Sequence, residues 1–407
     1  MKQADVVISG GGMVGLTLGL ALAQGGFKTV VADLVPASTI LDPSFDGRVS
    51  ALAYASVRML TALGVWEGLA PDAQPIREIL VTDGVAGRPA SPFSLHFDAA
   101  EVGTQALGHI AENRHIRAAL YGAVAAQKNL ELIAPTSVTS IAVESGGAIV
   151  RLQDGSEIAA PLVVAADGRE SRLRSEIGIG VVGWSYPQTG IVATVEHERP
   201  HNGVAYEHFL PSGPFAILPM TGNRSSLVWT EDKTKAPALL ALDEAGFHEE
   251  LSRRFGNHLG KISSAGHRWS YPLSFHLARE FVRPRFALAG DCAHGIHPIA
   301  GQGFNLGLKD AAALAEVLLD AGRLGRDIGA LDTLKRYERW RRFDSFALAA
   351  STDALNRLFS NDIMPLRHLR DLGLGIVDAI GPARRFFMRH AGGDVGKLPR
   401  LMKGEAA

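Results

Sequence analysis

The stretch VVISGGGMVGLTLGLALA at residues 6–23 restricts the fold of this chain more than any other. It has eighteen residues, no charge and five glycines. Its length, with Lys2 before it, would suit a membrane span or a signal peptide. Each glycine, however, weakens a helix by roughly 1 kcal/mol relative to alanine. A short apolar strand, a glycine turn and a helix instead predict a nucleotide-binding βαβ unit.

The glycines of this stretch match the pattern G-x-G-x-x-G. In such a loop the first glycine makes a tight turn, the second lets the backbone approach a pyrophosphate, and the third lets helix and strand pack closely. We expect the phosphates to lie on free backbone amides at the start of the helix. The predicted loop consists of Gly10, Gly11, Gly12, Met13, Val14 and Gly15.

An acidic residue follows the loop at the expected place. The helix is predicted to end near Gly25 and Gly26, and a second apolar strand, Thr29–Ala32, ends on Asp33. An acid about twenty residues beyond the glycines suits a pair of ribose hydroxyls and repels a 2'-phosphate. Nicotinamide and flavin dinucleotides share the adenosine half, so these residues alone leave the choice open.

Size and composition set further limits. With 407 residues, the chain exceeds the usual size of one hydrophobic core, so we expect two domains that can be interleaved. Its 41 Lys and Arg against 42 Asp and Glu give a net charge of -1, which predicts no nucleic-acid partner. The single cysteine, Cys292, excludes an internal disulfide and suits a reducing cytoplasm.

Two later stretches repeat the pattern of an apolar strand that ends in glycine and aspartate. Leu162–Ala166 leads into Asp167 and Gly168, and Phe286–Ala289 leads into Gly290 and Asp291. The second stretch continues into a helix with an apolar face, so this helix is predicted to pack on the core. Near its start, Gly301 and Gly303 would expose backbone donors that can stabilise negative charge on a bound ring.

With these three ordered motifs the chain resembles the group A flavin monooxygenases, which have the para-hydroxybenzoate hydroxylase fold. Within that group it resembles the UbiH/UbiF/COQ6 family of FAD-dependent ubiquinone-biosynthesis hydroxylases. The narrower resemblance rests on FDGRVSALAYASVRMLTALGVW from residue 45, which includes Asp46, and on HPIAGQGFNLGLKD from residue 297. ENRHIRAAL, FLPSGPFAILPM and LGLGIVDAIGPARRFFMRHAGG add to it, so the resemblance spans nearly the whole chain.

The resemblance implies that FAD is the bound cofactor. The N-terminal loop and the Gly290–Asp291 turn would hold its diphosphate and ribityl parts, and Asp167–Gly168 would lie at the channel for FAD and NAD(P)H. Asp33 stands where the superfamily usually has Glu. Other residues that the resemblance places at FAD are Arg48, Arg114, Val138 beside the adenine, and Gly301, Gln302, Gly303 and Asn305 beside the isoalloxazine. Pro298 and Ile299, next to the ring, are the predicted substrate contacts.

The predicted fold class is α/β, with a Rossmann-like FAD-binding domain interleaved with an antiparallel β-sheet substrate domain and followed by a C-terminal helical segment. Short alternating apolar runs predict the antiparallel sheet; they are Gly190–Val195, Val204–Leu210, Phe215–Met220 and Ser226–Thr230. The expected FAD-binding domain comprises residues 1–75, 98–180 and 272–345. Residues 76–97 and 181–271 would form the substrate domain, and residues 346–407 the helical region.

The implied reaction uses NAD(P)H and O2. Reduced FAD would form a hydroperoxide at flavin C4a, and its distal oxygen would hydroxylate a polyprenylated phenol in ubiquinone biosynthesis. Two alternatives stay open. The chain could be another flavoprotein of the superfamily, such as a prenyl reductase or a hydroxylase of a different aromatic, or a non-catalytic GDI-like prenyl-binding protein. The W-x-W-x-I-P motif of a halogenase is absent from the sequence.

Several reactive side chains are interpreted as structural. Cys292 lacks a partner cysteine and is expected to be a small core residue. His294 and His297 have helical spacing, but the glycine and proline beside them indicate a loop, so we expect no metal site. The stretch Trp340–Arg342 is expected to form an exposed helix face.

Two basic regions leave alternatives open. Arg169, Arg172 and Arg174 form either a solvated turn or a site that receives the nicotinamide cofactor. The last 43 residues carry eight basic and four acidic side chains, a balance of 8 - 4 = +4. This tail, with Leu366, Leu369, Ile376, Val377 and Ile380 at helical spacing, would pack on the FAD domain, or bind a membrane surface or a ubiquinone-biosynthesis complex. A homo-oligomer is also left open.

Overall fold

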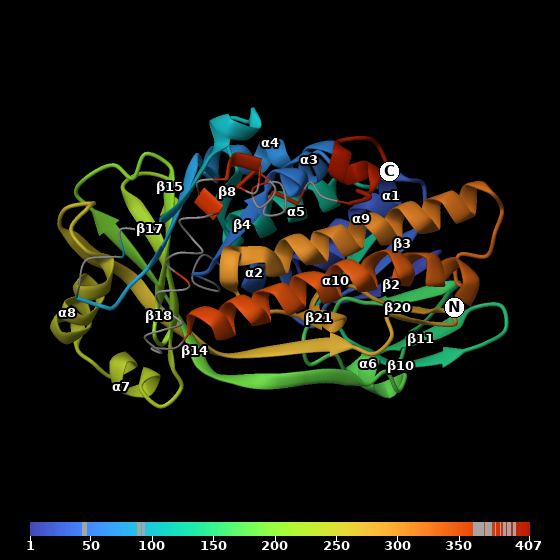
Figure 1. Cartoon of the computed structure of the whole chain (residues 1–407). Coiled ribbons are helices and arrows are strands. Elements are labelled where there is room, and N and C mark those ends of the chain that lie inside the picture. Colours follow the sequence, from blue (N-terminus) through green and yellow to red (C-terminus); the bar gives the residue numbers. More distant parts are fainter. Residues whose placement is uncertain are drawn as a thin grey trace.

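The computed structural model describes residues 1–42, 47–87, 91, 94–360, 370, 377–378, 380–382, 384–385, 388, 392–393 and 396–407. Asp46 of the resemblance motif and Leu366, Leu369 and Ile376 of the tail lie outside the described residues. The fold has two parts: a parallel sheet with helices, near both termini, and a larger sheet beside it (Figure 1).

The first part is built on a six-stranded sheet in the order β19-β20-β13-β2-β3-β9. All its pairs are parallel except β19 with β20. Its strands are β2 (Val6–Ser9), β3 (Thr29–Ala32), β9 (Leu130–Ile133), β13 (Leu162–Ala165), β19 (Val282–Arg283) and β20 (Phe286–Leu288). The residues of β2, β3 and β13 are all buried, which is typical of a parallel sheet covered on both faces.

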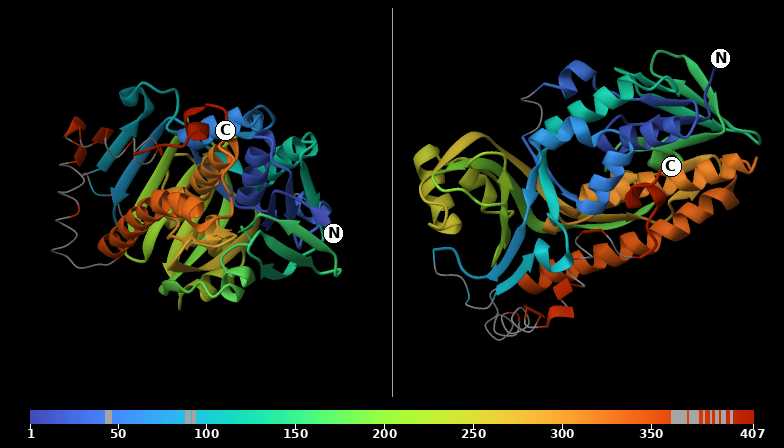
Figure 2. Two further views of the ribbon diagram at one scale, coloured as in Figure 1. Left: turned by 90° about the vertical axis from the view of Figure 1, so that its right-hand side faces the viewer. Right: turned by 90° about the horizontal axis from the view of Figure 1, so that it is seen from above.

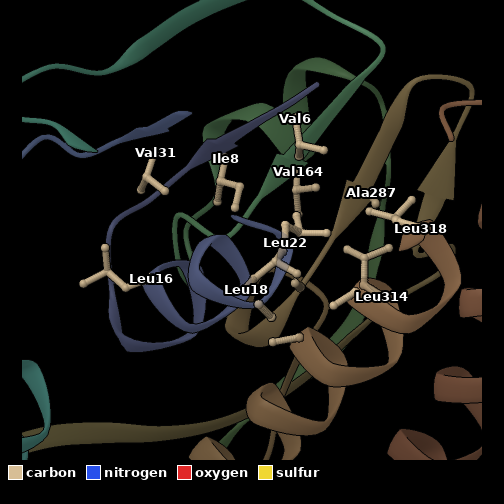
Figure 3. Packing of buried hydrophobic residues seen from close by; sticks show 14 of the residues in the cluster. Val6, Ile8, Leu16, Leu18, Leu22, Val31, Val164, Ala287, Leu314 and Leu318 are labelled. Atoms are coloured by element: carbon tan, nitrogen blue, oxygen red, sulfur yellow. The ribbon is translucent and has the colours of Figure 1, made fainter. Parts of the chain in front are cut away.

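Two helices cover one face of this sheet. Apolar side chains of α1 (Met13–Gln24) and α9 (Gln302–Arg323) meet beneath the strands, among them Leu18, Leu22 and Leu314 (Figure 3). At the end of α1 the packing is close, because a Cβ on Gly25 would lie 2.3 Å from a methyl carbon of Leu319. This packing fixes the positions of α1 and α9 on the six-stranded sheet. Both helices begin at the edge of the sheet where β2, β13 and β20 end.

Two small sheets complete the first part. One has the order β1-β12-β11-β10 and contains β1 (Lys2–Gln3), β10 (Val138–Val143), β11 (Ala148–Leu152) and β12 (Glu157–Ala160). The other has the order β4-β8-β5 and contains β4 (Val49–Ala53), β5 (Gln74–Ile76) and β8 (Gly108–Glu112). The shorter helices are α2 (Ala37–Ile40), α3 (Tyr54–Ala62), α4 (Trp66–Leu69), α5 (Asn113–Ala125) and α6 (Arg172–Glu176).

The second part is an eight-stranded sheet in the order β21-β18-β14-β17-β16-β15-β6-β7. Its strands are β6 (Glu78–Asp83), β7 (Ser94–Asp98), β14 (Val181–His197), β15 (Val204–Leu210), β16 (Gly213–Met220), β17 (Arg224–Asp232), β18 (Ile262–Ala278) and β21 (His294–Gly295). Only β15 and β6 pair in parallel among the described strands of this sheet. The long strands β14 and β18 connect this sheet to the first part (Figures 1 and 2).

The eight-stranded sheet has two different faces. Helices α7 (Ala236–Leu240) and α8 (Glu244–Phe255) cover the outer face, where Phe215 and Trp229 of the sheet pack against Phe247 and Leu251 of α8. The inner face looks toward the first part. The structure thus confirms the predicted fold class, in which a Rossmann-like unit is combined with a largely antiparallel sheet.

The C-terminal region contains α10 (Leu331–Phe359), which packs along α9 (Figure 1). Among the described residues, no helix is both long and apolar enough to span a lipid bilayer. The expectation that Trp340–Arg342 forms an exposed helix face is wrong for Arg341, which is fully buried. The guanidinium of Arg341 is buried because two carboxylates, from Asp310 and Asp344, bind it.

Candidate functional site

The glycine loop joins β2 to α1 by a turn in which only glycine fits at Gly10 and Gly15. Gly10 has φ of +106°, and a Cβ there would lie 2.4 Å from the carbonyl oxygen of Ala166. A Cβ on Gly15 would lie 1.9 Å from the Gly10 carbonyl oxygen. At Gly12, by contrast, a Cβ would meet no atom within 4 Å. The loop is therefore packed on the protein side and open where a ligand would approach.

Asp33 lies directly after β3, and its carboxylate holds the glycine loop. Oδ2 accepts a hydrogen bond from the backbone N–H of Gly11 at 2.5 Å, and Oδ1 accepts one from Val35 at 2.7 Å. The sequence motif predicts that this acid binds ribose hydroxyls, and each carboxylate oxygen retains a second lone pair for such a bond. Asp33 thus fixes the glycine loop, and its binding of a ribose stays a prediction.

The two Gly-Asp turns meet the glycine loop in space. Gly10 packs against the Ala166–Asp167 backbone, and a Cβ on Gly290 would lie 3.2 Å from a methyl carbon of Val14. Cys292 is buried and donates its thiol hydrogen to Oδ1 of Asp167 at 3.0 Å. Burial, followed by the charge of Asp167, raises the pKa of this thiol well above its usual value. Three segments that are far apart in sequence thus form one end of a site.

A buried ionic cluster supports the turn at Gly290. The carboxylate of Asp310 accepts hydrogen bonds from the Gly290 N–H at 3.0 Å, His294 Nε2 at 2.6 Å and Arg341 Nε at 2.8 Å. Burial alone would raise the pKa of Asp310, but His294 and Arg341 hold it below its usual value. Sequence reasoning missed this cluster, because Arg341 comes from α10 and nothing in its local pattern pairs it with Asp310.

The start of α9 is held against β4 by Asn305. Its Oδ1 accepts hydrogen bonds from the Ala53 N–H at 2.9 Å and from Ser56 Oγ at 2.8 Å, and its Nδ2 donates to the Ala51 carbonyl at 2.8 Å. Gly301, with φ of +60°, ends the preceding turn. Pro298, Ile299, Gln302 and Gly303 line the same space, and a Cβ on Gly303 would meet nothing within 4 Å. The first turn of α9 therefore presents free backbone donors to that space.

Of the remaining predicted cofactor residues, one lines the cavity and two do not. Arg48 lines the site, whereas Arg114 is an ion-pair partner of Glu112 at 2.9 Å and lies outside the cavity lining. Val138 is buried at the start of β10 and also lies outside the lining. The segment just before Val138 contacts Asp33, since the Thr136 N–H donates to the Asp33 carbonyl at 2.7 Å.

Apart from Arg114 and Val138, the predicted site residues surround one large cavity of about 2000 Å³. Those that line it are Gly12, Met13, Val14, Arg48, Gly168, Asp291, Pro298, Ile299, Gly301, Gln302, Gly303 and Asn305. Gly10, Gly11, Gly15, Asp33, Asp167 and Gly290 form the layer directly behind this lining. The residues fit FAD, because the open backbone at Gly12 and Gly303 can approach a diphosphate and a ring, and the volume exceeds what one ligand of ordinary size needs.

The cavity continues beyond this end into an apolar chamber. The inner face of the eight-stranded sheet supplies one wall, and α10 supplies part of another. Ile299 packs in one cluster with Leu95 of β7, Phe209 of β15 and Phe359 of α10. The apolar lining residues from β6, β7 and β15–β18 include Ile79, Val81, Leu95, Phe97, Ala205, Phe209, Ala216, Leu218, Val228 and Leu273. The chamber can hold an extended apolar molecule out of water.

The three basic residues after the Asp167 turn have separate roles. Arg174 is buried and donates to the carbonyls of Arg169 and Cys292, both at 2.9 Å. Arg172 is exposed and donates to the Thr139 carbonyl at 2.8 Å. Only Arg169 of the three lines the cavity, where it also donates to Ser274. Of the three, only Arg169 is therefore placed at the cavity, and its contact with a nicotinamide cofactor stays a prediction.

The two histidines after the Gly290 turn are both buried. His294 belongs to the Asp310 cluster, and the ring of His297 lies edge-on to Tyr186 with 5.2 Å between the ring centroids. Burial lowers the pKa of His297 to about 4, so its ring is neutral near pH 7. No group of three or more metal-ligating side chains occurs in the part of the chain that the structure describes.

One charged residue of the apolar chamber was missed by the sequence reasoning. Glu207 lies on β15 and lines the cavity together with Ala205 and Phe209. These three residues alternate along the strand, so their side chains share one face of the sheet. The alternation in AYEHF at residues 205–209 was the signal that could have located Glu207.

Comparisons with known proteins agree with this geometry. Residues 3–343 match the FAD binding domain family. The chain is 49% identical to ubiquinone hydroxylase UbiL of Rhodospirillum rubrum, over 99% of this chain and 93% of the relative. It is 36% identical to the Escherichia coli 3-demethoxyubiquinol 3-hydroxylase, over 96% of this chain and 98% of the relative.

Solved structures show the same fold at lower identity. Para-nitrophenol 4-monooxygenase PnpA of Pseudomonas putida superimposes with a TM-score of 0.80 at 20% identity, over 98% of this chain and all of that chain. PqsL of Pseudomonas aeruginosa, solved in complex with 2-aminobenzoylacetate, has a TM-score of 0.75 at 22% identity, over 88% of this chain and 97% of that chain.

Proposed function

This chain belongs to the FAD-dependent hydroxylases of ubiquinone biosynthesis, and from that premise we propose that it hydroxylates the ring of a polyprenylated phenol with NAD(P)H and O2 as co-substrates. The observation that carries the proposal is the continuity of the cavity. Its polar end is formed by the glycine loop and the two Gly-Asp turns, and its other end is an apolar chamber. A polyprenylated phenol needs both ends, because its ring is polar and its prenyl chain is apolar.

The turns would hold FAD along its length. The loop at Gly10–Gly15 would bind the diphosphate and Asp33 the adenosine ribose, while the Gly290–Asp291 turn and the start of α9 would lie beside the ribityl chain and the ring. Bound FAD, once reduced by NAD(P)H, supplies the activation of O2 that allows one oxygen atom to be transferred to an electron-rich ring. The protein supplies position, charge and exclusion of water.

The protein groups around the ring position have two tasks. The free N–H donors in the first turn of α9 would stabilise negative charge on a ring beside them, because the helix holds them in place. Ile299 and the apolar side chains packed on it keep bulk water from that region. Leu95 and Phe209 close the chamber on the side of the sheet.

We also propose that the substrate reaches the chamber from a lipid surface along α10. Phe343 and Phe346 of this helix are 75% and 57% exposed, and Leu355 is 41% exposed. Phe343 and Leu355 also line the cavity, so the exposed apolar side of α10 is continuous with the chamber. Exposed Arg339 and Arg342 beside these residues would favour anionic lipid.

Deletion of the gene in the source organism tests the proposed activity. We expect a prenylated phenol that lacks one ring hydroxyl to accumulate, with recovery of quinone after complementation by the wild-type gene. A complementing gene with Gly15→Ala, which blocks the glycine loop, should fail to restore quinone and serves as the matched control. Mass spectrometry of the lipid extract reads the result. An unchanged quinone pool in the deletion strain would remove the substrate assignment.

A further inference from the structure

A single acidic side chain interrupts the apolar wall of the chamber. Strand register places Glu207 in a row across five strands, next to Val81 of β6 on one side and Ala216 of β16 on the other. The row continues to Leu95 of β7 and Val228 of β17, and all five residues line the cavity. Among the described lining residues of these five strands, Glu207 alone carries a charge.

The neighbouring rows give Glu207 no partner. Ala205 and Phe209 flank it on β15. Their cross-strand neighbours Ile79 and Pro214 are apolar, and Asp83 of β6, which lies beside Phe209, forms an ion pair with Arg370 at 3.0 Å. Within the described residues, the Glu207 carboxyl has no hydrogen bond or ion pair. The exposed part of its side chain faces the cavity, which is enclosed by apolar groups on this side. Burial raises the pKa of Glu207 from 4.5 to about 7.

Such a residue weakens the fold unless it meets a ligand. A half-buried carboxyl without a protein partner is unfavourable, and an apolar side chain of similar size would pack better at this position. The row that contains Glu207 belongs to the same wall as Ile299, since Ile299 packs with Leu95 and Phe209. The carboxyl therefore shares its part of the chamber with the segment that borders the predicted ring position.

We propose that Glu207 is the catalytic base that accepts the proton of the substrate's ring hydroxyl. This inference rests on the proposed function. In the step the phenolic O–H bond breaks, its electron pair stays on the phenolate oxygen, and the proton forms a new O–H bond on the Glu207 carboxylate. No electrons are exchanged, and the proton returns to solvent or to the product hydroxyl. The phenolate ring is richer in electrons and is attacked by an electrophilic oxygen more readily.

The chemistry of the chamber suits this transfer. A phenol has a pKa of about 10, so a carboxylate with its ordinary acidity is a weak base toward it. In apolar surroundings the carboxylate is a stronger base, so the difference in pKa between the phenol and the carboxyl group becomes smaller. The other charged groups that line the cavity and could influence Glu207 across it are Arg48, Arg169, Glu170, Asp291, Lys309, Asp344 and Arg370. On β15 itself, His208 is held by Thr82, and burial lowers the pKa of this histidine to about 4, so it stays neutral.

The test compares the FAD-loaded wild type with Glu207→Gln, Glu207→Asp and the surface control Glu196→Gln. The substrates are a short-chain prenylphenol and its ring-fluorinated analogue, whose hydroxyl is more acidic. With the prenylphenol we expect Glu207→Gln to hydroxylate roughly 10²-fold more slowly, while it still binds FAD and oxidises NAD(P)H with release of hydrogen peroxide. Glu207→Asp should retain part of the activity, and Glu196→Gln should match the wild type.

Two further readouts separate a base from a merely structural residue. The kcat/KM of the wild type should rise as pH increases through about 7, because the free enzyme must hold a deprotonated Glu207, and this rise should be absent in Glu207→Gln. With the more acidic fluorinated phenol, the hydroxylation rates of wild type and Glu207→Gln should differ less than with the prenylphenol. The proposal would be overturned by equal hydroxylation rates for wild type and Glu207→Gln, or by a ratio of their rates that is the same for both phenols. If the wild type hydroxylates neither phenol, the proposed function itself fails, and this inference with it.

Discussion

At the scale of single residues, Gly15 is the position where the fold tolerates least change. A Cβ there would lie 1.9 Å from a backbone oxygen of the same loop, and backbone atoms cannot move aside as a flexible side chain can. We expect Gly15→Ala to lose bound FAD, measured as flavin absorbance per chain after gel filtration. The matched control is Gly122→Ala in α5, where a Cβ would meet nothing within 4 Å. That variant should keep FAD and gain up to about 1 kcal/mol in stability. Equal flavin content in both variants would contradict the role of the loop.

Glu207 also predicts a pH dependence of stability. Its pKa in the folded state, about 7, is higher than the 4.5 expected in the unfolded chain, so the folded state binds the proton more tightly. The wild type should therefore lose stability relative to Glu207→Gln as pH rises from about 4.5 to 7, by at most about 3 kcal/mol. Urea unfolding of both proteins at pH 5 and pH 8 measures this difference. If the two proteins differ by the same unfolding free energy at pH 5 and at pH 8, burial does not raise the pKa of Glu207.

At the scale of elements, the pairing of α9 with α10 depends on the Asp310–Arg341 ion pair. Both side chains are fully buried, and Asp310 also fixes the Gly290 turn. Arg341→Leu would leave the carboxylate partly unpaired, so we expect a loss of about 3–5 kcal/mol in unfolding free energy. Arg342→Leu, at an exposed neighbour, should change it by less than about 0.5 kcal/mol. Similar urea midpoints for the two variants would contradict this account of the cluster.

Helix α10 provides a second test at this scale. A double substitution, Phe343→Ser with Phe346→Ser, should reduce co-sedimentation with vesicles that contain anionic lipid, because it removes the exposed apolar side chains. Leu324→Ser, at a residue that is 66% exposed in the connection between α9 and α10, is the control and should bind as the wild type does. Activity with a short-chain phenol in detergent should be similar in all three proteins. Unchanged sedimentation of the double variant would exclude α10 as the lipid contact.

At the scale of the whole molecule, local patterns predicted the elements well and their long-range pairing less well. The strand Thr29–Ala32 and the strand Val204–Leu210 have the predicted ends, because alternation and flanking turn residues define them locally. Strand β14 is longer than the predicted run Gly190–Val195, since its first five residues are exposed and carry no apolar pattern, and the sequence analysis predicted no run within β18. The structure confirms the fold class.

The candidate site shows the same limit. The spacing of the glycines located the turns, because only glycine satisfies the steric restrictions at positions such as Gly10 and Gly15 and can be recognised in the sequence. Arg341 was misjudged as exposed because its partner, Asp310, is thirty-one positions away, and burial of a charge depends on that partner. Glu207 was missed because its environment is made by four other strands. The binding role of each predicted cofactor residue stays a prediction.

The central claim is that three separate turns hold one FAD at the polar end of a cavity whose apolar end holds a prenylated phenol. The most direct measurement is hydroxylation of a prenylphenol by the purified, FAD-loaded protein in the presence of NAD(P)H and isotopically labelled O2. The account predicts a product that carries one labelled oxygen on its ring, formed in step with NAD(P)H oxidation. NAD(P)H oxidation that yields only hydrogen peroxide, with the prenylphenol unchanged, would contradict it.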